Sequence, residues 1–251
     1  MNHIIVTGHS KGLGAGIVTE LLNENHHIHG ISRTDNSDLQ KLAAAKGCAI
    51  TFHKCDLSHT DTIPATIQRV AEAINREDTT GIYLVNNAGV IKPIGPVPDI
   101  DPVEIEHHIR INLMAPVFLI QEFIKHFHDW PVTKRILNIS SGAASNPYFG
   151  WSAYCTAKAG LEMFARCVAA EQEKQNHPVD IMSVAPGIID TDMQTIIRGT
   201  TDEQFIHRQK FIELKQTGQL IAPNLAGKKI VQLLFSADFT NGKSVDIRDT
   251  Y

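Results

Sequence analysis

The chain has 251 residues, of which 43% are hydrophobic and 20% charged, and this composition excludes a disordered, collagen-like or coiled-coil protein. Its 23 basic and 27 acidic side chains leave a net charge of −4, which disfavours nucleic acid and anionic membranes as partners. The length favours one domain. No apolar run is long enough to span a bilayer and the first residues lack the pattern of a signal peptide, so we expect a cytoplasmic protein.

Short apolar runs alternate with amphipathic stretches along the chain. Seven apolar runs are predicted strands: His3–Thr7, His27–Ser32, Ala49–Lys54, Ile82–Asn86, Lys134–Ser140, Val179–Ala185 and Lys243–Ile247. Six amphipathic stretches are predicted helices: Leu13–Asn23, Ser37–Ala45, Thr62–Asn75, Pro102–His126, Ser152–Gln175 and Leu225–Phe235. This alternation predicts an α/β fold, a single doubly wound domain over residues 1–251 with a sheet of about seven parallel strands and helices on both faces.

One polar segment, residues 188–218, separates the sixth predicted strand from the last helix and contains the helix-forming stretch Asp202–Lys215. Segments that follow a strand in such folds lie over the carboxyl edge of the sheet, where ligands bind. We interpret this segment as a substrate lid. A surface insertion without a role is the alternative.

The cysteines and histidines do not indicate a metal site. The four cysteines have no CxxC spacing, so we expect reduced thiols. The histidine pairs at 107–108 and 126–128 lack the spacing of known zinc motifs, and no metal is predicted.

Glycines mark the turn between the first strand and the first helix. The segment reads TGHSKGLG over residues 7–14, with Gly-xxx-Gly-x-Gly spacing. Glycine allows a tight turn and close backbone approach, and the helix N-terminus offers unpaired N–H groups and a positive dipole end to a pyrophosphate. The predicted dinucleotide contacts here are Gly8, Ser10, Lys11, Gly12, Leu13 and Gly14.

Charges after the second strand indicate which dinucleotide is bound. A carboxylate there would accept a hydrogen bond from the ribose 2′-OH, whereas a cation would pair with a 2′-phosphate. Arg33 follows this strand and Lys11 adds a second cation from the glycine turn, so NADP(H) is favoured over NAD(H). Asp35 is the opposing observation, because it could pair with Arg33.

Two further strand ends add candidate coenzyme contacts. Asp56 and Leu57 follow the third strand at the expected position of the adenine, although Asp56 could instead cap the next helix. Asn87, Ala88 and Gly89 follow the fourth strand in a small, amide-rich turn at the crevice, a composition that is also common in ordinary turns.

Three residues near the fifth strand form a candidate catalytic group. Ser141 follows that strand, and Tyr154 and Lys158 lie one turn apart on the next helix. Reduction of a carbonyl needs a proton donor, and a nearby ammonium would lower the pKa of a phenol, ordinarily ~10. Ser141 could donate a hydrogen bond to the same oxygen. Taken singly, these residues could be a packing tyrosine, a solvated lysine and a turn cap.

In these motifs the chain resembles the short-chain dehydrogenase/reductase family over essentially its whole length. The family's TGxxxGxG, NNAG, YxxxK and PGxxxT motifs each have a match, and Ser141 stands 13 residues before Tyr154, as in the family. The resemblance implies a Rossmann-type fold. It also implies that Pro186, Gly187, Ile189 and Thr191 bind the nicotinamide half of the coenzyme.

The resemblance also implies catalytic roles. Tyr154 is the implied general acid/base, Lys158 lowers its pKa and bonds the nicotinamide ribose, and Ser141 orients the carbonyl. Asn112 matches the family's helical asparagine, which holds a water in a proton relay ending at Lys158. Lys11 with Arg33 is similar to the NADP-preferring subgroup.

The chain departs from the family at its end, where a VDGG-like turn is replaced by KSVDIRDTY over residues 243–251, which leaves the contribution of the tail open. This tail and Ser140–Ala144 are similar to the sepiapterin reductase and benzil reductase branch. The helices Pro102–His126 and Ser152–Gln175 match the usual dimer interface of the family, so we expect a homodimer or homotetramer.

Tyr148, Phe149 and Trp151 lie between the catalytic Ser and Tyr and could line a pocket for a flat or aromatic carbonyl compound, with Tyr148 and Trp151 the candidate substrate residues. Packing at a lid or subunit contact is the alternative. The sequence thus predicts an NADPH-dependent carbonyl reductase acting on a small ketone or diketone. A 3-oxoacyl carrier reductase, an oxidative alcohol dehydrogenase and a non-catalytic NADP(H) sensor remain as alternatives.

Overall fold

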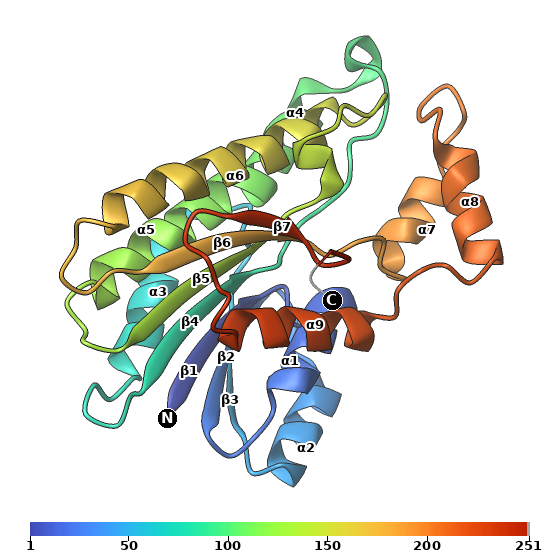
Figure 1. The fold of residues 1–251 in the computed structure, drawn as a ribbon. Helices are drawn as coiled ribbons and strands as arrows, with labels where there is room; N and C mark the ends of the chain where they lie inside the picture. The colour runs from blue at the N-terminus through green and yellow to red at the C-terminus, as the bar shows by residue number, and fades with distance from the viewer. Residues whose placement is uncertain (250–251) are drawn as a thin grey trace.

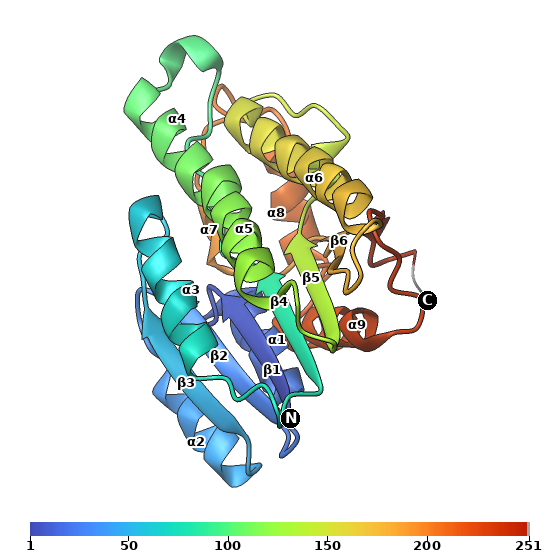
Figure 2. The same ribbon diagram turned by 90° about the vertical axis from the view of Figure 1, so that its left-hand side faces the viewer.

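The computed structural model describes residues 1–249, and its centre is one parallel β-sheet (Figures 1 and 2). The strands are β1 (Asn2–Thr7), β2 (His26–Ser32), β3 (Ala49–Lys54), β4 (Gly81–Asn86), β5 (Thr133–Ile139), β6 (Asp180–Ala185) and β7 (Ser244–Asp246). Their spatial order is β3-β2-β1-β4-β5-β6-β7. Each predicted strand is present, with both ends within one residue of the prediction. Val-, Ile- and Leu-rich runs bury both faces of the central strands β1, β4 and β5, whereas the edge strands β3 and β7 are partly exposed.

Helices cover both faces of the sheet, as predicted (Figure 2). One layer consists of α3 (Ile63–Glu72), α4 (Pro102–Ile109), α5 (Ala115–Phe127) and α6 (Ser152–Gln172). The other consists of α1 (Gly12–Leu21), α2 (Ser37–Ala45) and α9 (Pro223–Phe235). A separate hydrophobic core fills the space between the sheet and each layer. Gly16 and Gly227 let α1 and α9 approach closely, since a Cβ on Gly227 would lie 2.6 Å from the Gly16 carbonyl oxygen.

The predicted long helix Pro102–His126 is interrupted. A π-helical turn, η3 (Arg110–Met114), separates α4 from α5. Pro116 has no N–H to bond the carbonyl of Asn112 four residues earlier, so the regular α-helical ladder cannot pass this point.

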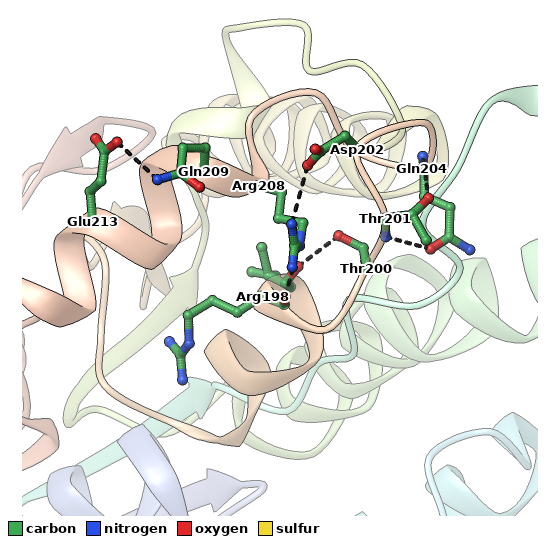
Figure 3. Close-up of polar contacts among 9 residues, drawn as sticks. Arg198, Thr200, Thr201, Asp202, Gln204, Arg208, Gln209 and Glu213 are labelled. Atoms are coloured by element: carbon green, nitrogen blue, oxygen red, sulfur yellow. Dashed lines mark hydrogen bonds and ion pairs between the residues drawn. The ribbon is translucent and has the colours of Figure 1, made fainter.

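The lid segment contains two helices, α7 (Asp192–Arg198) and α8 (Arg208–Gln216), which stand beyond the carboxyl ends of the strands (Figure 1). The predicted helix Asp202–Lys215 therefore begins six residues too early. Reciprocal hydrogen bonds between Thr201 and Gln204 form a turn there instead, as Figure 3 shows. No helix within residues 1–249 is long and apolar enough to cross a membrane.

Candidate active site

A cavity of about 1710 Å³ lies at the carboxyl edge of the sheet, between the strand ends and the lid. All the predicted coenzyme contacts line it: Gly8, Ser10, Lys11, Gly12, Leu13, Gly14, Arg33, Asp56, Leu57, Asn87, Ala88, Gly89, Tyr154, Lys158, Pro186, Gly187, Ile189 and Thr191. The predicted substrate residues Ser141, Tyr148 and Trp151 line the same cavity. The cavity thus brings together residues that are far apart in the sequence, such as Lys11 and Thr191.

The glycine turn has the geometry of an anion cradle. Gly8 and Gly12 have φ values of +65° and +55°, which other residues rarely adopt, and a Cβ on Gly14 would lie 2.1 Å from the Gly8 carbonyl oxygen. Lys11 is the N-cap residue of α1 and its side chain makes no cap hydrogen bond. The first N–H groups of α1 therefore remain for a ligand, and the cradle fits the pyrophosphate of a dinucleotide.

Asn87 joins the end of β4 to this turn. Its Nδ2 donates hydrogen bonds to the carbonyl oxygens of Thr7, at 2.9 Å, and Gly8, at 3.3 Å. The hydroxyl of Thr7 accepts bonds from the backbone N–H groups of Asn87 and Ala88, both at 3.0 Å. These contacts hold two neighbouring strand ends together at the floor of the cavity.

Arg33 and Lys11, the two cations expected to bind the 2′-phosphate, have different surroundings. Arg33 is exposed and, within residues 1–249, makes no ion pair with Asp35 or any other carboxylate. Lys11 does have a partner, because its Nζ lies 2.7 Å from Asp192 at the start of α7, and both side chains are 75% exposed. The sequence indicates Asp35 as a candidate partner of Arg33. It does not indicate Asp192, which the tertiary fold brings to Lys11.

Asp56 bonds its own turn and does not cap either helical segment that follows, and its contact with the adenine stays a prediction. Its Oδ1 accepts bonds from the backbone N–H and the hydroxyl of Ser58, at 3.0 and 2.9 Å, which makes it a local turn cap, and it also lines the cavity. Burial tends to raise the pKa of this carboxyl, but the bonds from Ser58 and the charge of Arg33 lower it overall.

Ser141, Tyr154 and Lys158 meet on the cavity wall because α6 begins beside the end of β5. Tyr154 is 8% exposed. Burial raises the pKa of Tyr154, and a hydrogen bond with Ser141 partly opposes this. Ser141 also caps the following turn, since its hydroxyl accepts from the N–H of Ala143 at 3.2 Å.

Lys158 behaves differently from the sequence prediction. Its Nζ donates to the carbonyl oxygen of Ile139 at 2.7 Å and lies 5.8 Å from the centroid of the Tyr154 ring. Burial lowers the pKa of Lys158 to about 8, with the charge of Glu162 opposing. The prediction that Lys158 lowers the pKa of Tyr154 is therefore not seen in this structure, where burial dominates both groups.

Asn112 lies behind the cavity wall and is 1% exposed. Its Oδ1 accepts from the N–H of Val90 at 2.8 Å, and its Nδ2 bonds the Val90 carbonyl and His108 Nε2, both at 2.7 Å. His108 continues this chain to the carbonyl of Lys92 at 2.6 Å, and its ring stands edge-on to Tyr154 with centroids 5.9 Å apart. Sequence analysis missed this role of His108, although it precedes Asn112 by one helical turn.

An aromatic group closes the substrate side of the cavity. Trp151 stacks on the lid residue Phe205 with centroids 4.6 Å apart, and Tyr148 lies 5.1 Å from Trp151. Tyr148 and Trp151 line the cavity and also pack with the lid, so the predicted packing is present, while their contact with a substrate stays a prediction. Phe149, in contrast, is 45% exposed.

The lid is internally braced and tied at its base. Arg208 of α8 donates to the carbonyl of Arg198 at 3.1 Å and pairs with Asp202 at 3.3 Å (Figure 3). At the base, backbone hydrogen bonds of 2.9 Å join Ile221 to Ile188 and Asp190. The segment is therefore held together by its own hydrogen bonds, and the parts of the chain at its two ends lie side by side.

The C-terminal tail also reaches the cavity, which the sequence left open. Asp246 and Arg248 line it and form an ion pair of 2.6 Å. The available signal was the replacement of the family's two terminal glycines by Ile247 and Arg248, which puts a cation two residues after Asp246. The last two residues of that tail, Thr250 and Tyr251, lie outside the described part of the chain.

The fold and this cavity place the chain in the class of Rossmann-type oxidoreductases that bind a nicotinamide dinucleotide. A family model described as short chain dehydrogenase matches residues 2–202. The chain belongs to the short-chain dehydrogenase/reductase family, whose members interconvert carbonyl and alcohol groups with NAD(P).

Similar proteins carry related names. The chain is 41% identical over 247 residues to a benzil reductase ((S)-benzoin forming) of Bacillus cereus, covering 98% of this chain and 99% of that one. It is 30% identical over 256 residues to a sepiapterin reductase of Meriones unguiculatus, covering 98% and 95%. Among solved structures, a short-chain dehydrogenase/reductase from Saccharomyces cerevisiae has a TM-score of 0.84 at 25% identity, covering 100% of this chain and 97% of that one.

Proposed function

We propose that this protein is an NADPH-dependent reductase of small ketones and diketones, with Tyr154 as the proton donor. The observation that carries this proposal is the placement of Tyr154 and Ser141 on the wall of one cavity that also contains the glycine cradle. Carbonyl reduction requires a hydride donor and a proton donor in one space, and this cavity offers a pyrophosphate cradle for the coenzyme together with the Tyr154 hydroxyl.

The chain's own groups divide the chemistry. When bound, the coenzyme supplies the hydride that reduces the carbonyl carbon. Burial keeps the Tyr154 phenol neutral at neutral pH, so it is ready to donate its proton to the carbonyl oxygen. The hydroxyl of Ser141 orients that oxygen, and the side chain of Lys158, which lines the same cavity, would bond the nicotinamide ribose.

In our proposal the proton-relay water binds the backbone carbonyl of Asn112 and not its side chain. The side-chain amide of Asn112 is already bonded to Val90 and His108, so it is not free to hold a water. Its backbone carbonyl lacks the usual α-helical donor, because that position is Pro116. We assign the relay water to this carbonyl, with His108 as a positioning residue that fixes Asn112 against Val90.

The preference for NADPH rests on Arg33. Its guanidinium is exposed at the cavity edge after β2 and has no carboxylate partner within residues 1–249, so it is available for a phosphate. Lys11 contributes once it exchanges Asp192 for the phosphate. Because that pair is exposed to water, the exchange costs little.

The substrate class rests on the aromatic wall. Tyr148 and Trp151 offer flat apolar surfaces beside Ser141, and such surfaces favour a planar or aromatic carbonyl compound. The names of the relatives, benzil reductase and sepiapterin reductase, agree with a vicinal diketone or a pterin side chain as the substrate.

Assembly belongs to the same proposal. We expect a homodimer or homotetramer through α5 and α6, and the exposure of Met163 on α6, at 53%, supports a partner on that face. A molecular mass measured by light scattering that equals one chain would contradict this expectation.

The proton-donor role is tested with Tyr154→Phe and the matched control Tyr148→Phe, which removes a hydroxyl from the same cavity. We expect Tyr154→Phe to lower kcat for benzil reduction about 10²–10⁴-fold while NADPH binding stays within a few fold. The control should keep most of its activity. Comparable turnover of Tyr154→Phe and the wild type would contradict the proposal.

A panel of diketones, pterins and acyl thioesters, followed as loss of NADPH absorbance, tests the substrate class. Faster reduction of aromatic diketones supports the proposal, and a preference for acyl thioesters would favour a 3-oxoacyl carrier reductase. If no compound in the panel is turned over in either direction, the protein is better explained as an NADP(H) sensor.

A further inference from the structure

Three histidines from two strands meet on one face of the sheet, outside the cavity. His3 of β1 is the direct register partner of His27 of β2, and His29 lies two residues further along β2. Residues two apart on a strand share a face, so register alone places these three side chains together. The spacing of 24 residues between His3 and His27 hides the group in the sequence.

The ring nitrogens are already close to coordination distance. One ring nitrogen of each histidine lies within 4.8 Å of one in each of the others. His3 Nδ1 and His29 Nε2 are 3.1 Å apart. Around a tetrahedral zinc ion with Zn–N of ~2.0–2.1 Å, neighbouring nitrogens are about 3.4 Å apart. Small rotations of the side chains therefore bring all three onto one ion.

Hydrogen bonds from two residues of β3 orient two of these rings. His53 on β3 places its Nε2 3.4 Å from His29 Nδ1, which leaves His29 Nε2 directed toward His3. The hydroxyl of Thr51 lies 2.9 Å from His27 Nε2. Metal-binding histidines usually have such an outer hydrogen bond, which fixes the tautomer and the orientation of the ring.

The three imidazoles differ in burial, which leaves one side of the group open. His29 is fully buried and His3 is 5% exposed, while His27 is half-buried and leaves an approach from solvent. The ring centroid of His27 lies 5.3 Å from that of His3 and 4.2 Å from that of His29, so the three rings already form one packed group.

The donor set selects the class of ion. Three imidazoles suit zinc, copper or nickel, whereas calcium and magnesium require oxygen ligands.

We propose that His3, His27 and His29 form a binding site for a divalent transition-metal ion such as Zn²⁺, with water as the fourth ligand. The site clamps the amino-terminal half of β1 to that of β2, at the end of the strands away from the coenzyme cavity. It is a structural site, independent of the proposed reductase activity, and it contradicts the sequence-based expectation that no metal binds.

The test compares zinc binding by wild type, His27→Gln and His177→Gln, all without an affinity tag and after removal of metal with a chelator. His177 is an exposed histidine outside the cluster, so its variant is the matched control. We expect one Zn²⁺ per chain for wild type and the control by calorimetry, and at least tenfold weaker binding for His27→Gln. Zinc should raise Tm only in the first two proteins, and NADPH-dependent turnover of His27→Gln should show that it is folded.

Equal zinc affinity in wild type and His27→Gln would overturn the site. A measurement on the wild type keeps the proposal falsifiable if the variant does not fold. X-ray absorption at the zinc edge should show about three nitrogen ligands near 2.0–2.1 Å with imidazole scattering. A spectrum of oxygen ligands only, or no zinc bound, would overturn it.

Discussion

Lys158 is 5% exposed, and we predict that Lys158→Met stabilises the fold while abolishing reduction. Its pKa is about 8 in the folded protein, against 10.5 for an ordinary lysine. At pH 7 the side chain is charged in both states, and the pKa difference corresponds to about 3 kcal/mol for holding the ammonium out of water. Methionine has a similar shape and carries no charge.

The variant also loses an interaction. The Ile139 carbonyl, which now accepts from Lys158 at 2.7 Å, is left without that donor, at a cost of about 1–2 kcal/mol. Glu162 loses the nearby cation but still accepts from the Ser140 hydroxyl at 2.5 Å. The net gain is about 1–2 kcal/mol, or a rise in Tm of about 2–8 °C for a chain of this size.

The pH dependence of the free energy of unfolding shows in which direction the stability difference between the variant and the wild type should change. Between pH 8 and 10.5 the unfolded chain keeps the lysine proton and the folded chain releases it, so wild-type stability rises with pH across this window. The advantage of Lys158→Met should therefore be full at pH 7, shrink above pH 8, and turn into a small disadvantage by about pH 10.5, where only the lost bond to Ile139 remains. Calorimetric scans at pH 7 and 10 measure it, with Lys174→Met, at an exposed lysine, as the control. A Tm at pH 7 equal to or below that of the wild type, or a difference independent of pH, would refute the reasoning.

Two further variants test the coenzyme site. Arg33→Asp should weaken NADPH binding at least tenfold and improve NADH binding, because a carboxylate repels the 2′-phosphate and accepts from the 2′-OH; an unchanged preference ratio would show that Arg33 does not contact that phosphate. Gly14→Ala should lower both Tm and NADPH affinity, since its Cβ would lie 2.1 Å from the Gly8 carbonyl oxygen, whereas Gly142→Ala, with nothing within 4 Å, should leave Tm unchanged. Equal melting temperatures for the two glycine variants would argue against a tight cradle.

Local chemistry made much of the fold predictable. The central strand runs β1, β4 and β5 are mostly apolar on both faces, a pattern that leaves few alternatives to a buried parallel sheet, and the ends of all the strands differ by at most one residue from the prediction. The helix break at Arg110–Met114 was harder to predict, because the helical spacing of apolar residues continues through it. Only the missing N–H of Pro116 disrupts the hydrogen bonds of the helix there. The sequence also placed the start of α8 too early. Residues after Asp202 are good helix formers, but hydrogen bonds between Thr201 and Gln204 hold this part of the chain in a turn.

The sequence by itself determined the order of strands and helices, the glycine turn and the spacing of Tyr154 and Lys158, because each of these depends on residues close together in the chain. Only the tertiary structure decided the contacts between distant segments. Burial, which depends on the whole packed core, reversed the expected pKa change of Tyr154, and chain folding placed Asp192 on Lys11. Strand register brought His3 beside His27, since pairing between strands is set by the core and not by distance along the chain.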